Sequence, residues 1–309
     1  MIKWFALLLI FNASILKGFS QVPTTDIYLL DMKVKHGKYV FTNPKKISGW
    51  KGYNNQPYFT PDGESIYYVS YRNKQSDIYK YDIGSKTTTQ FTNTPEDEYS
   101  PKLTPDGKYI SVVRVMKDSA QQLWEFPLGG GEPKHLLQGA DSIGYYCWQK
   151  GTVVMANVPE PMKLQIRDTQ IMYSPKKMGD IHNVSPSENI SKNAGRSLQL
   201  LDKKGKYVLF IQKPSDKKDS INWICILANR NVTAKLIATL PNCEDFALGP
   251  KNTLFMGKNG KMYKYRIGKD KDWIEIADFS NTEYKNFYRL AINVKGDKIA
   301  LVSYFGKKP

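Results

Sequence analysis

The stretch that decides the fold is Tyr99–Val113, which reads YSPKLTPDGKYISVV. A close copy, NQPYFTPDGESIYYV, stands 44 residues earlier at Asn55–Val69. Both copies hold Thr-Pro-Asp-Gly between two runs rich in aromatic and β-branched residues. Such a pattern is a hairpin signal, because glycine accepts positive φ without a Cβ clash and proline cannot extend the strand before it. Each copy therefore predicts a strand, a tight turn and a second strand.

The same turn recurs along the chain in weaker versions. Its glycine, or the asparagine that replaces it, stands at positions 63, 107, 151, 205, 252 and 296. Asparagine is the next best residue at a left-handed turn position. In the first unit two further strand-like runs follow the turn, at Asp77–Tyr81 and Thr87–Phe91, and the second unit has equivalents. Six units of four short strands predict an all-β fold, a six-bladed β-propeller.

The two ends of the chain are expected to meet. Little sequence follows the last turn, too little for two outer strands. Thr25–Asp31 reads TDIYLLD and parallels Ser76–Asp82, SDIYKYD, which is the third strand of the first unit. We therefore expect the N-terminal segment to complete the last blade and to close the ring, which would remove exposed sheet edges.

Residues 1–20 have the pattern of a secretory signal peptide. Lys3 precedes a mostly apolar run, Trp4–Leu16, and Gly18 and Ser20 are small residues at the −3 and −1 positions of a cut before Gln21. The run is too short and too interrupted for a spanning helix, and no cysteine follows it as in a lipoprotein. A buried N-terminal helix is the alternative. We expect one propeller domain over residues 21–309, periplasmic or secreted, with no membrane span.

Composition is compatible with one large core and gives no sign of a nucleic-acid partner. The formal net charge is +16, yet the lysines are scattered through turns, as at Lys203-Lys204 and Lys217-Lys218, which indicates solvated surfaces. An odd count of three cysteines leaves at least one thiol unpaired. The cysteines are Cys147, Cys225 and Cys243, of which Cys225 is expected to be a small core residue. The segment from Asp168 to Arg196 departs from the repeat and predicts an irregular outer edge and long loop between the third and fourth blades.

Motifs for metal, phosphate or nucleophilic chemistry are missing. The histidines, His36, His135 and His182, fall in different repeats, and the sequence holds no His/Cys ligand pair, no Gly-x-Ser-x-Gly and no phosphate-binding loop. We expect no cofactor, no metal and no catalytic residue. The acidic run Glu96–Glu98 is expected to be a solvated loop on the face opposite the Asp-Gly turns.

A ring of residues before the six inner strands is the candidate site. In a closed propeller these residues would surround the mouth of the central channel, where loops on a rigid scaffold carry function. The predicted partner-binding residues are Asn55, Glu98, Tyr99, Ser142, Arg196, Glu244, Asp245, Tyr288 and Arg289. Their mixed charges suit a polar peptide or protein segment better than a uniformly anionic glycan.

Phe91–Pro95 and Tyr99–Lys108 resemble the repeat of TolB-type propellers, the bacterial WD-like repeat written around Ser/Thr-Pro-Asp-Gly. The resemblance covers roughly residues 50 to 140. It implies a periplasmic scaffold whose channel mouth captures a partner, without the extra N-terminal α/β domain of TolB itself. We therefore expect a non-enzymatic, monomeric protein that binds a protein or peptide segment of the cell envelope. The alternative is a glycan-active lyase or hydrolase, for which Glu98 and Glu244 are the only plausible carboxylate pair.

Overall fold

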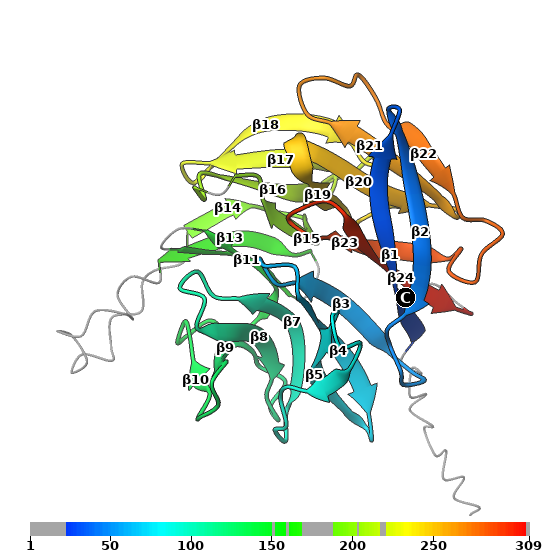
Figure 1. Ribbon diagram of the computed structural model, residues 1–309. Helices are drawn as coiled ribbons and strands as arrows, with labels where there is room; N and C mark the ends of the chain where they lie inside the picture. The colour runs from blue at the N-terminus through cyan, green and yellow to red at the C-terminus, as the bar shows by residue number, and fades with distance from the viewer. Residues whose placement is uncertain are drawn as a thin grey trace, which may run out of the picture.

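The computed structural model describes residues 23–149, 152–158, 161–168, 188–202, 204–216 and 221–306. Within these ranges the chain forms six antiparallel sheets of four strands each, arranged around a common axis (Figure 1). The predicted all-β fold and the six-bladed propeller are confirmed. The predicted signal peptide and the middle of the irregular segment, residues 169–187, lie outside the described residues.

Each blade extends from an inner strand near the axis to an outer strand at the rim, and its strands are named in that order (Figure 1). Blade 1 contains β3 (Asn54–Phe59), β4 (Ser65–Arg72), β5 (Gln75–Asp82) and β6 (Thr88–Gln90), and blade 2 contains β7 (Asp97–Leu103), β8 (Tyr109–Val115), β9 (Gln121–Pro127) and β10 (Lys134–His135). Blade 3 contains β11 (Ile143–Gln149), β12 (Thr152–Asn157), β13 (Lys163–Asp168) and β14 (Glu188–Ser191), and blade 4 contains β15 (Ala194–Leu200), β16 (Tyr207–Gln212), β17 (Trp223–Ala228) and β18 (Asn231–Ala238). Blade 5 contains β19 (Ala247–Gly249), β20 (Thr253–Lys258), β21 (Lys261–Arg266) and β22 (Ile274–Asp278), with a 3-10 helix, η2 (Pro250–Asn252), between β19 and β20. Blade 6 contains β23 (Phe287–Ile292), β24 (Lys298–Phe305), β1 (Thr24–Lys35) and β2 (Lys38–Lys46).

The Asp-Gly turns have the predicted conformation. The φ of Gly63 is 77° and that of Gly107 is 71°, and positions 205, 252 and 296 are also positive, whereas Gly151 lies outside the described residues. In the first turn the Asp62 carboxylate accepts hydrogen bonds from the Thr60 hydroxyl at 2.5 Å and from the Glu64 amide at 2.9 Å. The side chains of the Thr-Pro-Asp-Gly sequence thus form hydrogen bonds that stabilise the turn, and this explains why the sequence recurs between the first two strands of a blade.

Strand position within a blade determines burial. The second strands are covered on both faces by neighbouring blades, so Ile66–Val69 of β4 and Ile299–Val302 of β24 are all buried. The outer strand β6 is exposed along its whole length. A strand buried on both faces reads as a continuous apolar run rather than as an alternating one, as these sequences do.

The sixth blade combines the two ends of the described chain. Its strand order is β2-β1-β24-β23, and β1 pairs antiparallel with β24 from Thr24 opposite Phe305 to Asp31 opposite Lys298. Asp26 of β1 stands opposite Ser303, just as Asp77 of β5 stands opposite Ser70. The N-terminal segment and the third strand of blade 1 are therefore similar both in sequence and in the register with which they pair with the second strand of their blade.

The apolar core is divided among the junctions between blades. Strand β1 contributes to two of these junctions, because its side chains alternate between its faces. Tyr28 and Leu30 pack with Phe255 of blade 5, whereas Ile27 packs with Tyr68 of blade 1. The N-terminal segment is thus integrated into the core on both sides of its blade.

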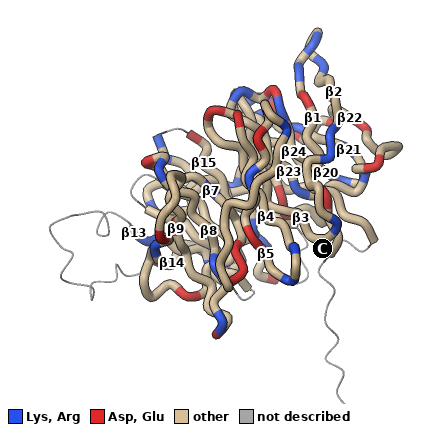
Figure 2. Tube along the Cα trace, turned by 60° about the horizontal axis from the view of Figure 1, so that its bottom comes forward, with Lys and Arg blue, Asp and Glu red and all other residues tan. Residues whose placement is uncertain are grey.

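Three further expectations can be compared with the fold. No disulfide joins Cys147, Cys225 and Cys243, all of which are described, and Cys225 is buried as expected. Figure 2 shows Lys and Arg residues spread over the blades rather than gathered on one of them. No helix in the described ranges is long and apolar enough to cross a membrane.

Candidate functional site at the mouth of the propeller

The mouth of the propeller is the face where the inner strands begin, opposite the Asp-Gly turns. In Figure 1 the inner strands β3, β7, β11, β15 and β23 gather around the centre of the ring. Five of the nine predicted residues form one hydrogen-bonded network at this face, which we call the mouth cluster. Its members are Asn55, Arg196, Asp245, Tyr288 and Arg289.

Asp245 is the centre of the mouth cluster. Its Oδ2 accepts hydrogen bonds from Arg196 Nε at 2.8 Å and Nη2 at 2.5 Å, and its Oδ1 accepts one from Arg289 Nε at 2.9 Å. Arg289 Nη1 donates to Asn55 Oδ1 at 2.8 Å, and Asn55 Nδ2 donates to the Tyr288 hydroxyl at 2.6 Å. The cluster therefore links blades 1, 4 and 6 with the segment that leads into blade 5.

Charge stabilises this arrangement. Burial alone would raise the pKa of Asp245, but Arg289 and Arg196 lower it below its ordinary value, so the carboxylate is ionised at neutral pH. The guanidinium carbons of Arg196 and Arg289 lie 5.6 and 5.8 Å from the ring centroid of Tyr288, within the range of cation–π attraction. Burial raises the pKa of Tyr288, so its hydroxyl stays neutral.

The cluster has an excess of positive charge and unused donors. Two guanidinium groups face one carboxylate, and the Arg196 side chain is 21% exposed. Arg196 Nη1 and Arg289 Nη2 have no hydrogen-bond partner in the part of the chain that the structure describes. These N–H groups can therefore donate to an acceptor brought by a ligand.

Glu98 does not lie in the mouth cluster. The expectation of a solvated acidic loop is wrong for this residue, which is fully buried between blades 1 and 2. It accepts a hydrogen bond from Thr94, and Arg114 Nε lies 3.5 Å from its Oε1. Burial, to which the neighbouring carboxylate of Asp77 adds, raises the pKa of Glu98 to about 8. Of the other two acidic residues of the run, Glu96 forms an ion pair with Arg114, and Asp97 accepts a hydrogen bond from the Ser76 backbone amide.

The remaining three predicted residues have partners of their own. The Tyr99 hydroxyl lies 3.0 Å from Ser76 Oγ of blade 1, and Ser142 Oγ accepts from Asn157 within blade 3. Glu244 forms a 3.1 Å ion pair with Lys213. Glu98 is thus enclosed between blades 1 and 2, whereas the Glu244 side chain lies beside Lys213 and is 32% exposed, so the two carboxylates considered for glycan chemistry lie in different environments.

The structure adds residues that the sequence prediction missed. Tyr145 of β11 is close enough to Arg196 and Arg289 to influence their pKa values, whereas Ser142 bonds to Asn157 of its own blade. Its spacing from Tyr99, 46 residues, could have revealed it, since the repeat period is similar. Lys102 of β7 lies deeper in the ring, near Tyr58 and Tyr146.

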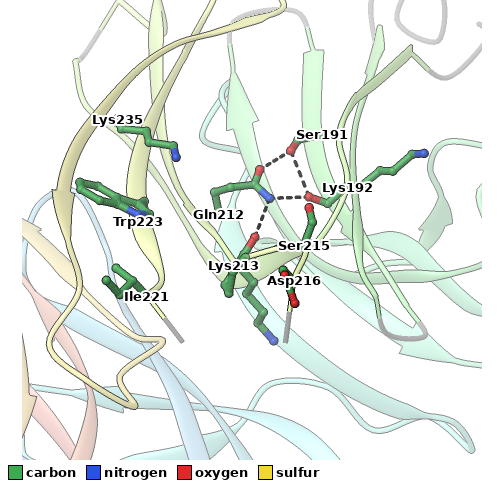
Figure 3. A pocket seen from close by; sticks show the side chains of 10 residues that line it. Ser191, Lys192, Gln212, Lys213, Ser215, Asp216, Ile221, Trp223 and Lys235 are labelled. Atoms are coloured by element: carbon green, nitrogen blue, oxygen red, sulfur yellow. Dashed lines mark hydrogen bonds between the residues drawn. The ribbon is translucent and has the colours of Figure 1, made fainter. Parts of the chain in front are cut away.

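A separate pocket of about 390 Å³ lies on the side of blade 4 (Figure 3). Gln212 Nε2 donates to the carbonyl groups of Lys192 and Lys213 in its wall, and Trp223 and Lys235 line the other side. Asp216 and Ile221, which also line it, stand in the sequence on either side of residues 217–220, which lie outside the described residues. No group of three or more His, Cys, Asp or Glu residues that could hold a metal ion occurs in the described ranges.

Comparison with known proteins supports the fold. No family model matches the sequence. A 130-residue stretch, 38% of this chain and 42% of the relative, is 28% identical to an uncharacterized protein of Agrobacterium fabrum. The solved structure of a putative TolB from Agrobacterium tumefaciens has a TM-score of 0.62 at 11% identity, covering 92% of this chain and 99% of that one.

Two other solved structures are similar. TolB from Acinetobacter baumannii has a TM-score of 0.53 at 15% identity, with 92% of this chain matched to 65% of that one. An oligogalacturonate lyase in complex with manganese has a TM-score of 0.55 at 11% identity, covering 87% and 83% of the two chains. Identities this low are evidence for fold alone. The fold of this chain is that of the TolB-like β-propellers, as its Thr-Pro-Asp-Gly repeats predict.

Proposed function

We propose that this chain is an exported, non-enzymatic and monomeric propeller that binds a protein or peptide segment of the cell envelope at its mouth. The supporting observation is the mouth cluster, in which two arginines from different blades share Asp245 and keep unused donors. Rigid inner strands fix the positions of these groups, and arginine is over-represented among residues that dominate binding energy at interfaces.

The bound segment should carry carboxylates. The sequence predicted a mouth of mixed charge, but Glu98 and Glu244 have basic partners of their own, which leaves an excess of cations at the centre. Guanidinium groups bind carboxylates through paired, charge-assisted hydrogen bonds. An acidic segment would therefore be attracted to the mouth and held there by Arg196 and Arg289.

Site-specific photo-cross-linking in intact cells tests this function. A photoreactive residue replaces Lys192, which is exposed in the loop before β15, or Lys108, which is exposed in an Asp-Gly turn on the opposite face. We expect a discrete cross-linked partner from position 192 and none from position 108. A partner that cross-links only from position 108 would show that the mouth is not the binding face.

A glycan-active enzyme is the second candidate. It is favoured by the fold similarity to the oligogalacturonate lyase and by the cationic mouth, which could also attract a uronate. Incubation with oligogalacturonate, with and without Mn²⁺, tests it through the ultraviolet absorbance of an unsaturated product. Turnover that the Arg289→Lys variant loses would show that the mouth is a catalytic site and would contradict the binding function.

A further inference from the structure

The hairpin of β1 and β2 extends beyond the strand on which it is built. β1 has 12 residues, whereas the third strands of the other five blades have six to eight. Its pairing with β24 ends at Asp31, but β1 continues to Lys35 and returns as β2. The turn residues His36 and Gly37 both have positive φ, as a tight two-residue hairpin requires. Figure 2 shows this two-stranded ribbon rising above its neighbours, with basic residues at its end.

The end of the ribbon, residues 33–38, is basic, and we call it the hairpin tip. Lys33 and Lys35 project from the same face because alternate residues of a strand share a face, and Lys38 stands directly opposite Lys35. All three lysines are exposed, and none forms an ion pair with a described residue. The Asp31 carboxylate is bonded to Lys298 at 2.7 Å. Like charges directly opposite each other destabilise a strand pair, so the fold alone does not account for this pattern.

The hairpin tip lies on the face opposite the mouth. The Met32 amide donates to the Asp297 carbonyl at 2.7 Å, which places the ribbon beside the Asp-Gly turn of blade 6. The 3-10 helix η2 of blade 5 lies against this turn, since a side chain at Gly296 would collide with its proline. Lys295 of the turn and Lys251 of η2 are both exposed. The basic surface therefore continues from the hairpin tip onto the adjoining turns.

The shape and charge of the hairpin tip fit a flat anionic surface. Nearby carboxylates already have partners within the protein, because Asp297 accepts a hydrogen bond from Asn293 and Asp270 forms an ion pair with Lys264. A projecting ribbon cannot enclose a small anion, but its lysines can reach the phosphates of an anionic membrane together. Val34, at the same end, is 59% exposed, and an apolar side chain among basic ones fits the boundary between headgroups and acyl chains.

We propose that the hairpin tip docks the propeller on an anionic phospholipid surface. Lys33, Lys35 and Lys38 bind the lipid phosphates, and Val34 enters the headgroup layer. Because the tip lies opposite the mouth, the docked propeller presents its mouth cluster away from the membrane. The docking goes beyond the proposed function and does not depend on it, since no residue of the mouth takes part.

Co-sedimentation with vesicles tests this docking. The probe is the purified chain with vesicles of equal parts phosphatidylglycerol and phosphatidylcholine. We expect the triple variant Lys33→Gln, Lys35→Gln, Lys38→Gln to bind at least about tenfold more weakly, because each lysine near an anionic surface contributes to the attraction. Its melting temperature should equal or exceed that of the wild type, since opposed like charges are removed.

The matched control removes the same charge from the other face. Lys51, Lys74 and Lys117 are exposed in loops on the side of the mouth, and their joint replacement by glutamine should leave vesicle binding unchanged. Raising the salt concentration to about 1 M should release the wild type, because the Debye length falls to about 3 Å.

Four results would overturn the docking. They are no binding of the wild type to the anionic vesicles, equally strong binding to pure phosphatidylcholine vesicles, an equal loss in the two triple variants, and tighter binding of polygalacturonate through the same lysines. The last would show that the partner is an anionic polymer. Failure of the proposed function is distinguishable: no partner would cross-link from position 192, although the vesicles would still bind through the hairpin tip.

Discussion

Replacing Asp245 by asparagine removes the only carboxylate of the mouth cluster while keeping its volume. The side chain is 7% exposed and accepts three hydrogen bonds from two guanidinium groups. Breaking a buried ion pair by removing one partner costs about 3 to 5 kcal/mol of folding free energy. Because Arg196 is partly exposed and can recover hydration, we expect the lower end, about 3 kcal/mol.

Urea unfolding at pH 7 measures this cost directly, and a thermal scan should show a melting temperature lower by about 5 °C for a chain of this size. The effect should depend on pH in a defined direction. The folded pKa of Asp245 lies below its ordinary value, so its contribution is present at neutral pH and is lost as the pH falls below about 4. The difference between wild type and variant should therefore shrink in acid.

The matched control is Glu275→Gln on the outer strand β22. Glu275 also accepts two 3.0 Å hydrogen bonds from a basic residue, Lys261, but both side chains are well exposed. Its loss should change stability by about 0.5 kcal/mol or less. A cost for Asp245→Asn no larger than that of the control would refute the view that Asp245 organises the mouth.

Three further predictions concern the fold and export. Glu98→Gln should be more stable than the wild type at pH 8. The pKa of Glu98 is raised to about 8 in the folded protein, so the wild type loses stability as the pH rises from about 4 to 8. Urea unfolding midpoints of both proteins across that pH range measure the difference. A chain that begins at Gly49, and so lacks β1 and β2, should lose its cooperative thermal transition; an unchanged melting temperature would show that the ring closes without them. N-terminal sequencing of the exported protein should find Gln21 first, and recovery of Met1 in the envelope fraction would contradict a cleaved signal peptide.

The architecture could be predicted because its signals are local. The left-handed position after Asp62 or Asp106 favours glycine whatever surrounds it, and the threonine and aspartate form a hydrogen bond within the same few residues. Such signals survive in a single sequence and repeat at the blade period. The fold could therefore be predicted from the residues of the turn and from the spacing of its copies along the chain.

The site residues could be predicted only in blades where they stand at the same number of residues before the Asp-Gly turn. Five residues separate β3 from β4, but only two separate β11 from β12, so counting back from the third turn ends at Ser142 instead of Tyr145. Glu98 was misplaced for another reason. Neighbouring residues of a strand point to opposite faces, and both faces of β7 are covered.

Lys102 was missed because its environment is entirely non-local. In sequence it is one of many lysines in strands and turns, for which a solvated position is the usual outcome. Its surroundings come from blades 1 and 3, 44 residues away in either direction along the chain. No local pattern contains that information.

The mouth cluster also connects the site to the junction between the first and last blades. Asn55 of blade 1 bonds to Tyr288 and Arg289 of blade 6, so these contacts exist only when those two blades are adjacent. The same junction is stabilised by Ile27 and Leu29 of β1, which pack between the two blades. Binding at the mouth should therefore depend on the N-terminal strands, although none of their residues belongs to the cluster. A ligand that bridges Arg289 and the inner strands would in turn stabilise the junction, since anything that binds only the closed ring favours it by mass action.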